Sequence, residues 1–230
     1  MLVTQNSSAD LELSTIPYIE LCFNVIGSVI GADHAYDLYG AISRRCPALH
    51  GYEGVSIQTI TGIPDRQGKI FLSNEKSYLK IRIPYDPGLM SQTLSLSGKR
   101  LMIGQYPISL GIPKMFALKP AEILKSRIVI IKGFKEPEPL LEAAKNKLRM
   151  IGIDADALVP LNVQGEADRK TIKISKKIKG KEKSFTIVGF GLVVSELSPE
   201  DSIKLQILGI GGKRRMGCGI FVPYEVSHEN

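Results

Sequence analysis

The chain has 230 residues, of which 43% are apolar and 23% charged, and this suits one large globular domain or two small ones. The composition excludes a disordered chain, a collagen-like repeat and a disulfide scaffold. The formal net charge is +7, but no lysine or arginine precedes Arg44. The chain from Arg44 onward carries about +12, because the first 43 residues contribute −5 through five acids (Asp10, Glu12, Glu20, Asp33 and Asp37). Basic charge segregated in this way predicts a polyanionic partner, most often a nucleic acid.

The three cysteines, Cys22, Cys46 and Cys218, are odd in number and lack metal-ligand spacing, so free thiols are predicted. The best apolar run, residues 21–30, is too short to span a bilayer, and no basic stretch precedes it as in a signal peptide. We therefore expect a cytoplasmic protein with no membrane role.

The first half of the chain alternates strand-like and helix-like patterns. Residues 18–30 are β-branched and apolar, which predicts a buried strand. Asp33 then stands as an expected N-cap before a helical pattern that Pro47 closes. Strand patterns follow at 55–61, 69–72, 78–83 and 100–104, with a short helix expected near 89–96. This order, β-α-β-β-α-β, predicts a ferredoxin-like unit.

The second half repeats the pattern. It predicts strands at 126–132, 169–178, 184–195 and 220–223, an amphipathic helix at 137–150, and a short helix at 201–208. The predicted fold class is therefore α+β, with two tandem ferredoxin-like (RRM-like) folds and a C-terminal glycine-rich loop. The boundary is expected near residues 105–118, which gives domains at 1–110 and 111–230.

The sharpest local feature is the glycine-rich segment, residues 209–219, which has five glycines and three consecutive cations, Lys213, Arg214 and Arg215. Glycines such as Gly211 and Gly212 permit positive φ and close backbone approach, so several N–H groups can face one anion. The segment lacks the Walker spacing and does not open a helix after a strand, so no NTP or NAD site is expected. Binding to a polynucleotide backbone is favoured.

A basic hairpin is predicted between residues 169 and 183. Its cations are Arg169, Lys170, Lys173, Lys176, Lys177, Lys179, Lys181 and Lys183. Ile172 and Ile174 alternate with polar residues, so one face can pack while the other presents charge. With few aromatic residues nearby, only Phe185 and Phe190, the hairpin favours recognition of duplex shape over unpaired bases.

Three histidines have different expected roles. His34 starts the first helix, where a structural hydrogen bond is expected. His50 follows that helix in a loop beside a glycine and a tyrosine and is free to reach a cleft. His228 lies in the polar C-terminal tail. No two of them have metal-site spacing, so neither a metal site nor another cofactor is expected.

Two stretches carry a family resemblance: IGADHAYDLYGAISRRCPALHGY (30–52) and LQILGIGGKRRMGCGIF (205–221). With the interior segments SRIVIIKGF and KTIKISKK, they resemble the CRISPR-associated repeat-cleaving endoribonucleases of the Cas six family, nearest to its myxan-type branch. The resemblance covers residues 18–223. It implies a metal-independent nuclease that cuts CRISPR repeat RNA by attack of a ribose 2′-hydroxyl, leaving a 2′,3′-cyclic phosphate and a 5′-hydroxyl.

The resemblance also implies site residues. The histidine after the first helix of the family maps onto His50. The helix tyrosine of the family falls at Ser43, which leaves Tyr36 or Tyr39 as a substitute, and Arg44 or Arg45 is expected to supply a cation. Lys213, Arg214 and Arg215, with Gly211 and Gly212, match the RNA-contacting loop, and Arg169, Lys170 and Lys173 lie on the hairpin expected to grip a repeat stem.

The expected partner is CRISPR repeat RNA, with other subunits of a CRISPR effector complex as further candidates, and the protein is expected to be a monomer or a homodimer. The alternative function is a non-catalytic RNA-binding subunit of the same superfamily.

Overall fold

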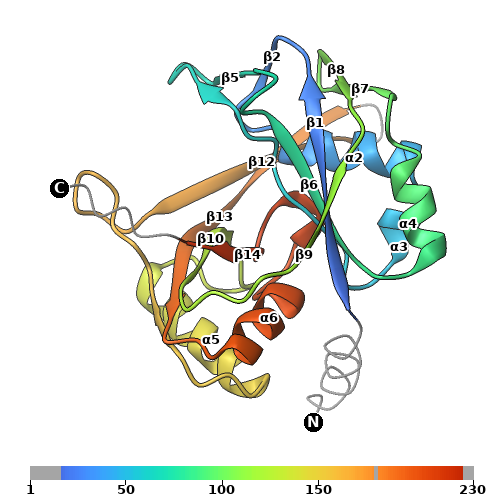
Figure 1. The fold of residues 1–230 in the computed structure, drawn as a ribbon. Helices are drawn as coiled ribbons and strands as arrows, with labels where there is room; N and C mark the ends of the chain where they lie inside the picture. The colour runs from blue at the N-terminus through green and yellow to red at the C-terminus, as the bar shows by residue number, and fades with distance from the viewer. Residues whose placement is uncertain (1–16, 179–180, 225–230) are drawn as a thin grey trace.

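The computed structural model describes residues 17–178 and 181–224. It confirms the α+β class: two antiparallel sheets, each covered by helices, lie side by side (Figure 1). The first sheet has the order β3-β6-β1-β8-β7, with β9 also pairing with β1. Its strands are β1 (Tyr18–Ile26), β3 (Ser56–Ile57), β6 (Tyr78–Pro84), β7 (Arg100–Ile103), β8 (Tyr106–Leu110) and β9 (Lys114–Ala117), and its helices are α2 (Ala35–Arg45), α3 (Ala48–Gly51) and α4 (Pro87–Leu94).

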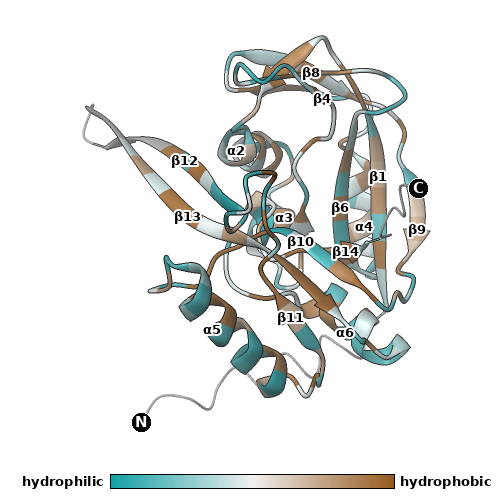
Figure 2. Cartoon of the chain, turned by 90° about the vertical axis from the view of Figure 1, so that its left-hand side faces the viewer, coloured by the Kyte–Doolittle hydropathy of each residue, from teal (hydrophilic) through white to brown (hydrophobic). Residues whose placement is uncertain are grey.

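The second sheet has the order β11-β13-β10-β14, and β12 also pairs with β13. Its elements are β10 (Leu124–Val129), α5 (Pro137–Met150), β11 (Asp156–Leu158), β12 (Arg169–Ile178), β13 (Lys181–Ser195), α6 (Pro199–Leu208), the 3-10 helix η1 (Arg214–Met216) and β14 (Phe221–Pro223). The long β12–β13 hairpin projects away from the rest of the sheet (Figure 2). The two sheets share one strand order: β3-β6-β1-β8 in the first sheet corresponds to β11-β13-β10-β14 in the second.

A small third sheet stands apart from the two large ones. It has the order β2-β5-β4 and consists of β2 (Val29–Gly31), β4 (Ile63–Pro64) and β5 (Lys69–Phe71). The single strand predicted for 18–30 is therefore wrong: the chain leaves the first sheet after β1, and β2 belongs to the small sheet. Gly27 permits this exit, since a Cβ there would lie 3.1 Å from the Leu72 side chain and 3.2 Å from that of Ile108.

The predicted N-cap of the first helix is also wrong. His34 occupies the N-cap position of α2, and no side-chain hydrogen bond caps the helix there. The Asp33 carboxylate instead accepts a hydrogen bond from the backbone N–H of Lys173 on β12, at 2.6 Å. A long-range contact to the second sheet thus replaces the local cap.

Three apolar clusters form the core. One lies under the first sheet and one under the second. The third joins the two halves of the chain, and its buried members are Ala35, Ile128, Ile130, Ile172, Ile174, Met216 and Cys218. Helix α2 therefore packs against β10, β12 and the glycine-rich segment. Within the described residues, no helix is long and apolar enough to cross a membrane.

Candidate active site

The position of His50 follows from a break between two helices. Helix α2 ends at Arg45, because Pro47 has no backbone N–H to continue it. The chain then makes the one-turn helix α3, in which the N–H of His50 donates to the Pro47 carbonyl oxygen at 2.9 Å. Leu49 is fully buried and anchors this turn in the first core, while His50 is exposed. His50 thus lies on a short helix rather than in the predicted loop.

His50 is paired with Tyr39 of α2. The Tyr39 hydroxyl lies 2.6 Å from Nδ1 of His50, and the two rings stack with their centroids 5.7 Å apart and their planes at 15°. Tyr39 is half-buried against both the first core and the third cluster, so the core positions its phenol. The hydroxyl occupies Nδ1, and Nε2 of the imidazole has no hydrogen bond to any of the described residues. Such a pair can transfer a proton at Nε2 while the hydroxyl holds the ring in place.

The other predicted catalytic residues are not part of this pair. The Ser43 hydroxyl is buried and has no hydrogen-bond partner among the described residues, so it is not available to a substrate in this conformation. Arg44 is exposed, and its guanidinium lies beside Gly40 on the same helix, since a Cβ built on Gly40 would be 3.3 Å from Nη1. Tyr36 packs against the third cluster. Of the two candidate tyrosines, the structure therefore brings Tyr39 to His50.

Four of the five glycines in the glycine-rich segment allow close packing, whereas Gly212 has open space where a Cβ would lie. A Cβ on Gly211 would collide with the Ile130 carbonyl, and a Cβ on Gly219 with the Ile210 carbonyl. The N–H of Gly212 donates to the Ile130 carbonyl at 3.0 Å, and the N–H of Gly219 donates to a carbonyl of β10 at 2.8 Å. The N–H groups of Gly212 and Gly219 therefore do not face an anion, and the expectation that other N–H groups of the segment do so stays a prediction.

The three cations of this segment differ in their contacts. Lys213 is exposed, with a left-handed backbone at φ 64°. The Arg214 guanidinium donates to the carbonyl of Ile207 near the end of α6. The Arg215 guanidinium donates to the Tyr52 carbonyl at 2.6 Å, two residues beyond His50. Arg215 therefore connects the glycine-rich segment to the C-terminal end of α3, the short helix that carries His50.

The cations of the hairpin also differ in their exposure and contacts. Arg169 and Lys173 are exposed, while Lys170 is half-buried and forms an ion pair with Asp168. The predicted alternation holds where side chains are described, since Ile172 and Ile174 are buried. The predicted cations from 176 to 183 lie outside the residues whose side chains the structure describes, as does His228.

His34 has the structural role predicted for it. Its side chain is 3% exposed, with Nδ1 at 2.8 Å from the Gly31 carbonyl and Nε2 accepting the Ile60 N–H at 2.9 Å. One nitrogen donates and the other accepts, so the ring is the neutral tautomer with its proton on Nδ1. Burial lowers the pKa of His34 below its usual value of 6.5.

We expect the free energy of unfolding to fall as the pH drops from 8 to 5, and His34→Gln to reduce this dependence. The folded-state pKa is depressed, so the contribution of His34 is present above the unfolded value of 6.5 and is lost at lower pH, where the unfolded chain binds the proton. Urea unfolding followed by circular dichroism at several pH values measures the effect. An equal pH dependence in His34→Gln and the parent protein would contradict the prediction.

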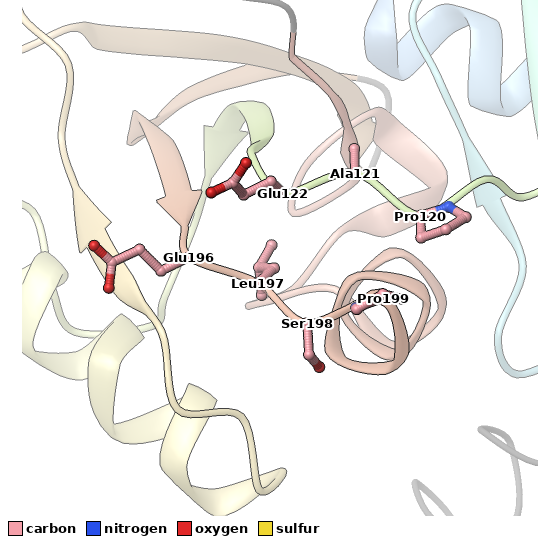
Figure 3. A pocket seen from close by; sticks show the side chains of 7 residues that line it. All are labelled: Pro120, Ala121, Glu122, Glu196, Leu197, Ser198 and Pro199. Atoms are coloured by element: carbon pink, nitrogen blue, oxygen red, sulfur yellow. The ribbon is translucent and has the colours of Figure 1, made fainter.

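A hollow of about 660 Å³ lies between the chain that precedes β10 and the turn that joins β13 to α6. Figure 3 shows its lining, which contains the carboxylates of Glu122 and Glu196 and no cation. Carboxylates repel phosphates, so this hollow does not suit RNA. In the part of the chain that the structure describes, no group of three or more His, Cys, Asp or Glu side chains is placed to hold a metal ion.

The family follows from comparison with known proteins. Residues 19–226 match the model of the family described as Cas6 Crispr. The chain belongs to the Cas6 family. A Cas6 relative from Myxococcus xanthus, named CRISPR-associated endonuclease Cas6, is 31% identical over 211 residues, which cover 90% of this chain and 81% of the relative.

Solved structures agree on the fold. A CRISPR-associated protein Cas6 matches with a TM-score of 0.56 at 18% identity, covering 91% of this chain and 99% of its own. A structure titled an RAMP protein binding different RNA substrates matches with a TM-score of 0.53 at 14% identity, covering 91% of this chain and 100% of its own. A Cas6-related protein from Pyrococcus furiosus matches with a TM-score of 0.51 at 16% identity, covering 94% of this chain and 100% of its own.

Proposed function

We propose that this Cas6-family chain is an endoribonuclease that cleaves CRISPR precursor RNA within its repeats to make guide RNAs. The observation that carries the proposal is the Tyr39–His50 pair, in which an exposed imidazole is held by a core-packed phenol. Arg215 bonds to the carbonyl of Tyr52, two residues after His50, and so links this part of the chain to the glycine-rich segment. The basic charge from Arg44 onward suits an RNA substrate.

The reaction is a transesterification that needs no cofactor. The ribose 2′-oxygen bonds to the adjacent phosphorus and loses its proton, while the bond from phosphorus to the 5′-oxygen breaks and that oxygen gains a proton. A 2′,3′-cyclic phosphate and a 5′-hydroxyl remain. His50 serves one of the two proton transfers through Nε2, as general acid or base, and the exposed Arg44, five residues after Tyr39 on α2, offsets the developing phosphorane charge.

The test is incubation of the protein with a labelled repeat RNA in excess EDTA, beside the same RNA carrying a 2′-deoxy sugar at the mapped cut. One cut in EDTA that the deoxy sugar abolishes supports the proposal. Binding without any cut would instead favour a non-catalytic RNA-binding subunit, the function suggested by Ser43 at the position of the family's tyrosine. Loss of cutting in EDTA alone would contradict the metal-independent reaction.

We expect Lys213→Ala to weaken repeat binding and to reduce the slope of log Kd against log salt by about 0.7–0.9. Lys213 is the exposed cation of the glycine-rich segment, so its charge is free to displace a counterion from a phosphate. The control is Lys170→Ala, since Lys170 is already paired with Asp168 and its removal changes the slope less. Fluorescence anisotropy at several salt concentrations measures both slopes, and equal slopes in Lys213→Ala and the parent protein would refute the prediction.

The same proposal extends to architecture and assembly. Both halves are ferredoxin-like folds, a reading that the shared strand order of the two sheets supports, and they correspond to domains 1–110 and 111–230. Strand β9 pairs with β1 although it follows residue 110, so the linker between the domains also contributes to the first sheet. The protein acts in the cytoplasm as a monomer or homodimer, alone or with other effector-complex subunits.

A further inference from the structure

A groove of about 830 Å³ opens on the face of the second sheet that carries the glycine-rich segment. We name it the lysine groove. It lies between the turn after β10, strand β13 and the start of the glycine-rich segment. The polar and aromatic side chains of its lining are those of Lys132, Phe134, Lys135, Lys147, Thr186 and Lys213. Four of these six residues are cations, and none of the described residues that line the groove is acidic.

The groove combines charge with an aromatic surface. Phe134 is 37% exposed, and the turn that carries it is closed by its N–H donating to the Ile131 carbonyl at 3.1 Å. Gly133, which precedes Phe134 in this turn, has a φ of 95°, a conformation that favours glycine, and Lys132 and Lys135 flank the two residues in the chain. The floor includes Ile187 and Val188 of β13. An apolar floor, an aromatic ring and a lysine rim match an unpaired nucleotide, whose base stacks and whose phosphate is anionic.

The groove adjoins the candidate active site through one segment of chain. Lys213 lines the groove, and two residues later Arg215 donates to the Tyr52 carbonyl beside His50. An RNA strand held at His50 can therefore continue over Lys213 into the groove. The hollow of Figure 3, with its two carboxylates, offers no such path.

We propose that the lysine groove binds unpaired RNA nucleotides that lie next to the cleaved phosphodiester, with Phe134 stacking on a base and Lys132, Lys135 and Lys213 contacting phosphates. This inference rests on the proposed function. It also differs from the sequence-based expectation that recognition of duplex shape is favoured over recognition of unpaired bases. Phe190, one of the two aromatics considered there, is only 2% exposed and cannot stack on a base, whereas Phe134 was overlooked. Its signal was a phenylalanine set between lysines directly after a predicted strand.

The first experiment measures stacking. A fluorescent adenine analogue is placed at successive unpaired positions of the repeat RNA, and its quenching on binding is followed with the full chain. We expect quenching at one or two positions, loss of that quenching in Phe134→Leu, and its retention in Phe134→Tyr. The Kd of Phe134→Leu for this RNA rises by about 5- to 100-fold, and RNA trimmed to remove those positions binds both proteins alike. Equal quenching and equal Kd in Phe134→Leu and the parent protein would overturn the proposal.

The second experiment measures charge, with a matched control. Lys135→Glu and Lys145→Glu change the net charge equally, but Lys145 lies outside the groove and pairs with Glu142 on the surface of α5. We expect only Lys135→Glu to weaken binding of the untrimmed RNA and of an eight-residue oligouridylate markedly. Equal effects of the two substitutions would overturn the proposal, since they would show that RNA binding depends on the net charge of the protein and not on the groove.

The two proposals fail in distinguishable ways. If the parent protein does not cut repeat RNA, the proposed nuclease function fails, while the dependence of oligouridylate binding on Phe134 still tests the groove. If the protein cuts repeat RNA and every groove variant binds and quenches like the parent protein, the groove alone fails and an acidic protein partner becomes the better occupant.

Discussion

His50→Ala is expected to lower the single-turnover cleavage rate by about 10²–10⁴-fold at saturating protein, with a Kd for repeat RNA within about twofold of the parent value. The imidazole is exposed and its Nε2 is free to face the RNA, so its loss removes a proton-transfer group while leaving the cationic surfaces in place. Cleavage of labelled repeat RNA and anisotropy titration measure the two quantities. Full cleavage by His50→Ala would remove His50 from the site.

Tyr39→Phe is the matched control for this prediction. It removes the hydroxyl that lies on Nδ1 of His50 and keeps the stacked ring. The rate is expected to fall by no more than about tenfold, the equivalent of one hydrogen bond. A loss as large as that of His50→Ala would mean that Tyr39 itself transfers a proton. An unchanged cleavage rate in Tyr39→Phe would argue against the positioning role.

Arg82→Met is expected to lower the free energy of unfolding by about 3–5 kcal/mol. Arg82 on β6 is 1% exposed, and its guanidinium reaches across to the second half of the chain. Its Nη1 donates to the carbonyl oxygens of Gln206 at 2.6 Å and Phe221 at 3.1 Å, and its Nη2 lies 3.1 Å from the Glu20 carboxylate. Methionine fills similar space but leaves the carboxylate and both buried carbonyls without this donor.

Lys80→Met tests whether the effect belongs to the buried cation. Lys80 contacts the same Glu20 carboxylate at 3.1 Å, but its side chain is 40% exposed. A solvent-exposed pair contributes about 0.2–1 kcal/mol, so Lys80→Met is expected to be mild. Urea unfolding of both variants and of the parent protein measures the difference. Similar losses in the two variants would contradict the view that Arg82 holds the two halves together.

Local signals in the sequence were sufficient for several elements. The helix at 137–150 was predicted at the bounds of α5, because its apolar spacing is regular and prolines mark its first turn. The strand at 169–178 matches β12, since alternating isoleucines identify a half-buried strand without reference to the rest of the chain. The short strands β8, β9 and β11 went unpredicted, because their few residues pair with distant strands and carry little local pattern.

The sequence by itself determined the fold class, the family resemblance, and an exposed histidine after a helix closed by proline, because each depends on residue type and short-range spacing. Only the tertiary structure decided which tyrosine meets that histidine: Tyr39 reaches His50, while the Ser43 hydroxyl is buried. It also decided that Arg214 and Arg215 bond to backbone carbonyls while Lys213 stays exposed, and that Phe134 adjoins the glycine-rich segment. These outcomes depend on contacts between residues far apart in the chain, which arise when the two halves pack together.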